Sequence, residues 1–201
     1  MRHFTSLALL ALLAACKPAA DSAPADKEPA APPVPEAKAD GPAAATTAVS
    51  LDGEGLRFVD KTTGKTSLLA FGVPRAEAEQ ALARVMGKED DRRTALVVGA
   101  GPMEFTRYDA MTLNFQDGKF AGWFLGNEPG AENYSTMSGI AVGTPRAKAA
   151  ASVKLVAIED STLGEEFSLG EGENVVGGMF AAPGDAAKID ALFAGTNCFF
   201  R

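Results

Sequence analysis

Acidic clusters are the candidates for chemistry in the body of this sequence, because carboxylates can act as acids, bases or cation ligands. The clusters are Glu89-Asp90-Asp91, Glu165-Glu166, and Glu171 with Glu173. The first lacks the spaced acidic residues of a calcium loop and is followed directly by two arginines. A hydrolase would need two carboxylates held opposite each other in a cleft, which sequence spacing does not show. We therefore expect solvated loops and turns here, with no catalytic residue, no metal and no cofactor.

Histidine is nearly absent, which excludes several kinds of site. The single histidine is His3, at the start of the chain. Histidine is the usual general base near neutral pH and the commonest transition-metal ligand. Without His3 the chain cannot form a Ser-His-Asp or Cys-His site, or a zinc site of cysteine and histidine ligands. Val98-Gly99-Ala100-Gly101-Pro102 also lacks the third glycine and the following helix of a dinucleotide-binding loop, so we expect a tight turn there.

Residues 1–15 have the pattern of a secretory signal, with a cationic start, a short apolar run and small residues before a cut. Cys16 follows Leu13-Ala14-Ala15, and this ending resembles the lipobox of bacterial lipoproteins. The resemblance implies cleavage before Cys16 and attachment of lipid to that residue. The apolar run is shorter than the roughly 20 residues of a membrane-spanning helix. An ordinary cleaved signal, with Cys16 as a bystander, is the alternative.

Removal of the signal would change the charge of the chain. Arg2 would be lost, leaving 18 of the 19 basic residues against 26 acidic ones, a side-chain charge of −8. Such a chain repels phosphate groups, so we expect no nucleic-acid partner. Contact with the membrane would come from the lipid anchor alone. Lys17 does not resemble the aspartate signal of inner-membrane retention, which favours the periplasmic side of the outer membrane.

Cys198 is the only other cysteine. If Cys16 carries lipid, Cys198 has no partner within the chain, and an unpaired thiol in an oxidising compartment is notable. One interpretation is a small buried hydrophobic residue between aromatic neighbours. The alternative is a free thiol that is reactive or bonded to another molecule.

Residues 16–50 are rich in alanine and proline and contain no aromatic residue. Such a segment cannot bury enough apolar surface to offset its ordering entropy, so we expect a disordered linker. Residues 51–201 are long enough for one domain with its own core. We expect the linker to hold this domain away from the membrane surface.

Turn and cap signals predict the main elements of this domain. A hairpin is expected around residues 60–65, and a second at Asp117-Gly118, where strands 111–116 and 119–125 meet. Helices are expected over residues 75–86, after Pro74, and over residues 145–156, with Thr144 as the N-cap. Further strands are expected at 95–98, 104–108, 164–169, 175–181 and 188–193.

The two helix starts resemble each other, since Phe71-Gly72-Val73-Pro74-Arg75-Ala76 echoes Val142-Gly143-Thr144-Pro145-Arg146-Ala147. This predicts an α+β fold of two strand–helix–antiparallel-meander repeats, at about 51–130 and 131–201. Alternatively, any short helix entered from a strand tends to use these residue types. The motif Gly-x-Pro-Arg-Ala resembles the SmpA/OmlA family of outer-membrane lipoproteins, and the tandem resembles the beta-lactamase inhibitor protein fold. Both resemblances imply binding or scaffolding without catalysis.

The aromatic residues suggest where a partner could bind. Most should be core, but in this architecture a helix covers only one face of a sheet, and the other face can bind protein through aromatic and arginine side chains. The candidate partner surface is Arg107, Tyr108, Trp123 and Tyr134. We expect a lipid-anchored envelope protein that binds an envelope protein and is not an enzyme. The alternatives are a carboxylate-dependent hydrolase of envelope glycans or peptides, and an inhibitor of an envelope enzyme.

Overall fold

The computed structural model describes residues 46–95 and 100–199. The chain divides into two units, residues 1–38 and 39–201, and every described residue belongs to the second. The predicted signal and Cys16 lie outside the described residues, as does most of the predicted linker. Strand β1 (Thr47–Asp52) begins before residue 51, so residues 47–50 belong to a strand and not to the linker.

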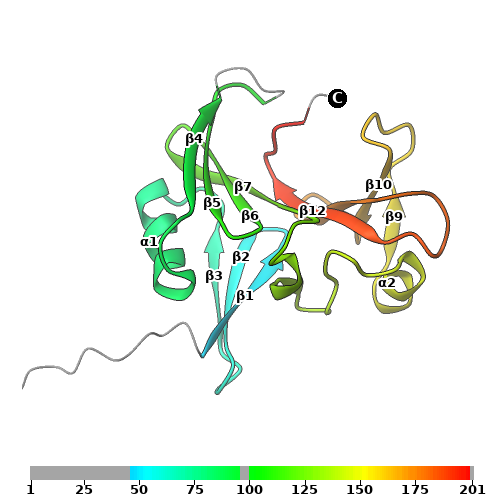
Figure 1. Cartoon of the computed structure of the whole chain (residues 1–201), viewed down its shortest axis with the longest axis horizontal. Coiled ribbons are helices and arrows are strands. Elements are labelled where there is room, and N and C mark those ends of the chain that lie inside the picture. The colour runs from blue at the N-terminus through cyan, green and yellow to red at the C-terminus, as the bar shows by residue number, and fades with distance from the viewer. Residues whose placement is uncertain (1–45, 96–99, 200–201) are drawn as a thin grey trace, which may run out of the picture. The chain divides into compact units, whose positions relative to one another are not determined.

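The described residues form twelve strands in two sheets, together with two α-helices (Figure 1). The small sheet has the order β3-β2-β1-β8, in which β8 is parallel to β1. The large sheet is antiparallel throughout, with the order β4-β5-β6-β7-β12-β11-β10-β9. The remaining strands are β2 (Gly55–Asp60), β3 (Thr66–Ala70), β4 (Asp91–Ala95), β5 (Met103–Tyr108), β6 (Met111–Gln116), β7 (Lys119–Gly126), β8 (Ser135–Thr136), β9 (Leu155–Ala157), β10 (Glu165–Leu169), β11 (Val176–Phe180) and β12 (Ile189–Gly195).

The prediction of an α+β domain built from two strand–helix–meander repeats is wrong, because the fold is mainly β. Strands β1–β3 form most of a separate sheet before the first helix. The helices are short: α1 (Arg75–Met86) has 12 residues and α2 (Arg146–Ser152) has seven. The amino-terminal half therefore contains an additional sheet that the carboxyl-terminal half does not match.

The first helix has the predicted bounds, and the second does not. α2 ends at Ser152 because Val153 is extended and Val156 pairs with Ser168 of β10. β-Branched residues favour this extended conformation. Thr144 is not the cap of α2; Pro145 occupies that position.

Both predicted hairpins are present. Asp117 and Gly118 have φ values of 51° and 71°, as the tight turn between β6 and β7 requires, and Gln116 pairs with Lys119 across it. The β2–β3 hairpin spans the other predicted turn. The strand expected at 95–98 begins earlier, because β4 covers Asp91–Ala95 and only its last residue overlaps that range.

The core lies between the two sheets and includes both helices. Leu51 and Leu56 of the small sheet, Leu82 of α1 and Ala149 of α2 belong to one apolar cluster with residues of the large sheet. Trp123 of β7 joins the two sheets, because its indole N–H donates to the backbone oxygens of Asp52 (3.0 Å) and Gly55 (2.8 Å). One face of the large sheet is thus covered by the core.

Candidate functional site

The opposite face of the large sheet, which we call the open face, carries a row of side chains that runs across the strands. Phe124 of β7 is paired with Thr112 of β6 on one side and with Phe193 of β12 on the other. Gly177 and Ser168 continue the row on β11 and β10. Side chains alternate between faces along a strand, so Phe124 points away from the core residues Trp123 and Leu125.

A second row begins at the edge of the sheet. Arg93 of β4 pairs with Phe105 of β5, and Phe105 pairs with Asn114 of β6. The guanidinium carbon of Arg93 lies 5.6 Å from the centre of the Phe105 ring, within the range of a cation–π contact. Arg107 of β5 pairs with Thr112 and so adds a second arginine to this face. The open face therefore combines aromatic rings, amides and arginines.

Residues 196–199, which we call the C-terminal segment, lie on the open face. The Asn114 side-chain amide donates to the Thr196 backbone oxygen (3.0 Å) and to the Asn197 side-chain oxygen (2.8 Å). A Cβ on Gly122 would lie 2.2 Å from the Thr196 oxygen, so glycine is needed there for the segment to cross the sheet. Phe199 packs edge-on against Phe193 and Phe124, with ring centres 4.8 and 6.1 Å apart.

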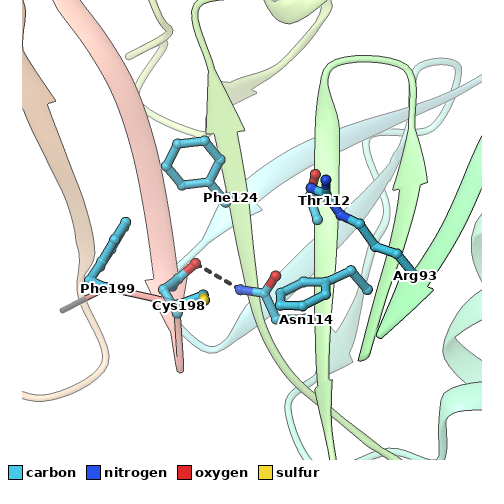
Figure 2. A pocket seen from close by; sticks show the side chains of 8 residues that line it. Arg93, Thr112, Asn114, Phe124, Cys198 and Phe199 are labelled. Carbon is cyan, nitrogen blue, oxygen red and sulfur yellow. Dashed lines mark hydrogen bonds between the residues drawn. The ribbon is translucent and has the colours of Figure 1, made fainter. Parts of the chain in front are cut away.

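A hollow of about 210 Å³ lies beside the C-terminal segment (Figure 2), and we call it the first hollow. It is lined by Arg93, Phe105, Thr112, Asn114, Phe124, Asn197, Cys198 and Phe199. Arg93 forms no ion pair within the described residues, whereas its neighbour Arg92 pairs with Glu79 at 2.8 Å. The first hollow therefore has apolar walls and, at its edge, a positive charge that no described residue pairs with.

A second hollow of about 420 Å³ lies on the other half of the sheet. Its lining includes Glu166, Ser168, Glu173 and Phe193. A Cβ on Gly177 would lie 2.5 Å from the Phe193 ring, so this glycine leaves room for the ring. Glu166 is buried and accepts a hydrogen bond of 2.5 Å from the Ser161 hydroxyl. The second hollow thus presents carboxylates where the first presents an arginine.

The predicted partner surface is wrong for three of its four residues. Trp123, Tyr108 and Tyr134 are buried in the core, and burial raises the pKa of Tyr108 to about 12. Arg107 is exposed, and its guanidinium pairs with Glu128 at 2.5 Å. These four residues do not form one exposed surface.

Cys198 has no disulfide partner within the described residues and is half-buried. It packs against Met103 and Phe105 in a small apolar cluster and borders the first hollow. This position combines the two interpretations drawn from the sequence, since the thiol is packed among apolar side chains and also lies at the edge of a hollow. Cys16 lies in the part of the chain that the structure does not describe.

Two residues of the first acidic cluster have structural partners. Asp90 accepts a hydrogen bond from the backbone N–H of Asp109 at 2.5 Å, and Glu89 pairs with Arg92 at 3.3 Å. Asp91 is the first residue of an exposed edge strand and not part of a loop. Across residues 46–95 and 100–199, no group of three His, Cys, Asp or Glu side chains is placed to hold a metal ion.

Sequence reasoning missed Arg93, Asn114, Phe193 and Phe199 as site residues. One signal was available: Thr112 and Asn114 alternate with the core residues of β6, which marks the face they share. The same alternation separates Phe124 from Trp123. The position of Phe199 depends on the C-terminal segment turning back over the sheet, which no local pattern indicates.

Comparisons with known proteins found no family model, no curated protein and no solved structure that matches this chain. Neither α1 nor α2, the described α-helices, is long and apolar enough to cross a membrane.

Proposed function

We propose that this chain is a lipid-anchored cell-envelope protein whose domain binds an envelope protein through the open face. The signal-like residues 1–15, Cys16 and the alanine- and proline-rich residues that follow support the anchored location. The lack of histidine beyond His3 favours binding over the common forms of acid–base catalysis.

One observation carries the binding role: the open face has two hollows with aromatic walls, and α1, α2 and the small sheet contribute to the core on the other face. Binding sites are typically hollows with apolar walls and a few converging polar groups. Arg93, Asn114 and Glu173 supply such groups. The opposite charges of the two hollows favour a partner whose own charges are arranged to match.

Site-specific photo-crosslinking in cells tests this proposal. A photoreactive residue replaces Thr112, which lines the first hollow, and a matched chain carries it at Glu77, an exposed residue of α1. We expect a discrete adduct with an envelope protein from position 112 and none from position 77. Identical patterns from the two positions, or no adduct from position 112, would contradict the proposal.

The same cells test the anchor and the rival functions. Cys16→Ser should move the chain out of the membrane fraction, and unchanged fractionation with normal processing would contradict lipidation. An adduct with an envelope enzyme whose activity the protein lowers would favour an inhibitor over a scaffold. A hydrolase would have to use Glu166 and Glu173 in the second hollow, and release of fragments from purified peptidoglycan that Glu173→Gln abolishes would favour it.

A further inference from the structure

We infer that the first hollow binds the free carboxyl-terminal end of a polypeptide whose last residue is aromatic. This inference rests on the proposed function, because it names the part of the envelope partner that enters the open face. Three properties of the hollow support it: an arginine that forms no ion pair with the part of the chain that the structure describes, walls made of phenylalanine rings, and polar side chains within the lining.

The charge of the hollow selects an anion. Each of Arg57, Arg75, Arg92, Arg107 and Arg146 forms an ion pair, whereas Arg93 and Arg84 form none with the described residues. Arg93 borders the first hollow, whose lining includes three phenylalanine rings, whereas Arg84 borders a different hollow with one phenylalanine, Phe58, in its lining. The chain as a whole carries a net charge of −7, so a free cation on this face is a local exception. A guanidinium can bind two oxygens of a carboxylate or of a phosphate at once, and the carboxylate is the anion that a polypeptide carries at its end.

The walls of the hollow select an aromatic group. Phe105, Phe124 and Phe199 line it. Aromatic rings prefer edge-on or offset contacts, and Phe199 already makes such a contact with Phe124 on this face. The volume of about 210 Å³ is smaller than the roughly 300–1,000 Å³ of pockets for drug-sized ligands. One side chain with its terminal carboxylate is therefore a better occupant than a nucleotide-sized molecule.

The polar lining can bind the peptide group of such a chain end. The Thr112 hydroxyl has no hydrogen bond within the described residues, although it lies in the lining. Figure 2 shows Arg93 extending from its strand toward Thr112. With the terminal carboxylate on Arg93, the last peptide N–H can donate to the Thr112 hydroxyl oxygen while the ring enters among the phenylalanines. The site thus recognises the terminal carboxylate, the last peptide group and the aromatic ring of the chain end together.

A pair of small probes tests the inference. The full chain carrying Cys16→Ser, which stays unlipidated, is titrated with N-acetyl-L-phenylalanine and with N-acetyl-L-phenylalaninamide, which lacks the carboxylate. Binding is followed by the NMR signals of the Asn114 and Asn197 side-chain amides. We expect the acid to shift both signals, and the amide to bind at least about fivefold more weakly because it loses the charge-assisted contact.

Two variants locate the contact. Arg93→Gln should remove the difference between the two probes, while Arg84→Gln, the matched unpaired arginine on α1, should preserve it. Equal affinity for both probes, or no shift with either, would overturn the inference. An adduct from position 112 in cells combined with no binding of the acid would leave the proposed function standing and reject this ligand. Binding of the acid without an adduct would reject the protein-binding function and keep the site.

Discussion

The starts of α1 and α2 are built alike and stabilised differently. At both, a glycine N–H donates across to the large sheet at 2.7 Å, from Gly72 to Phe120 and from Gly143 to Ile189. The arginine that begins each helix pairs with a carboxylate at 2.7 Å, and its guanidinium lies over a phenylalanine ring, 5.0 Å away at Arg75 and 4.0 Å away at Arg146.

The difference lies one helical turn further on. Glu79, four residues after Arg75, accepts from the Arg75 Nε at 2.9 Å and from the Thr106 hydroxyl at 2.6 Å. The corresponding position in α2 is Ala150. The Arg146 Nε is buried and has no hydrogen-bond partner within the described residues. A satisfied polar network stabilises a helix start, whereas a buried donor without a partner costs free energy, so the side chain at this position distinguishes the start of α1 from that of α2.

The largest expected effect comes from removing the two arginines in turn. Arg75→Met should lower the free energy of unfolding by about 3 kcal/mol, because Glu79 keeps its half-buried charge and loses a main partner. Arg146→Met should cost about 1 kcal/mol, since it also removes the unsatisfied Nε. Urea denaturation measures both values, with the exposed Arg84→Met as the control. Equal losses at the two helices would contradict the comparison.

The contribution of each helix start to the free energy of unfolding should also depend differently on pH. Burial acts to raise the pKa of Glu79, but hydrogen bonds from Thr106 and Arg75 and the charge of Arg92 outweigh it and hold this pKa below its usual value. A carboxyl whose pKa is lower in the folded state stabilises the fold above its unfolded pKa, and this stability is lost as the pH falls through the folded pKa.

Glu79→Gln should therefore flatten the fall in unfolding free energy as the pH drops below about 4.5, the ordinary value for a glutamate. Urea denaturation at a series of pH values gives the slope. Glu77→Gln is the control, because it removes an exposed carboxylate from the same helix. Its slope should equal that of the parent chain. If the two variants show the same slope, Glu79 is not the residue that makes the stability of the first helix sensitive to acid.

Local signals in the sequence predicted the parts of this fold that depend on neighbouring residues. Asp117-Gly118 predicted a hairpin, and Pro74 predicted the start of α1. The first strand of the small sheet was missed because residues 47–50 resemble the preceding linker in composition. They form a strand through pairing with β2, which lies later in the chain.

The candidate site was harder to predict because it depends on which face of a strand is buried. Trp123 and Phe124 are neighbours in an apolar run, so the run itself does not indicate which of them faces the core. Trp123 faces inward because its indole N–H reaches carbonyls about 70 residues away, at Asp52 and Gly55. Arg93 follows an acidic run, and this pattern suggested a loop. Arg93 lies instead in an edge strand, and charged side chains are common in edge strands because they discourage pairing with other chains.

The smallest expected effect is also the most direct test of the comparison, because it adds to α2 the side chain that α1 already has. Ala150 is exposed and lies four residues after Arg146, so Ala150→Glu places a carboxylate where Glu79 stands relative to Arg75. Pairs at this spacing contribute about 0.2–0.5 kcal/mol. The gain should be at the upper end of that range, because the new carboxylate can accept from the buried Arg146 Nε.

Urea denaturation of Ala150→Glu alone and combined with Arg146→Met isolates this contact as a double-mutant cycle. We expect the gain to disappear in the double variant. Ala150→Gln, which has nearly the same shape without the charge, should recover less than half of it. A gain that persists without Arg146 would show that the glutamate acts on the helix itself, and the contrast between the two helix starts would then need a cause other than the missing carboxylate.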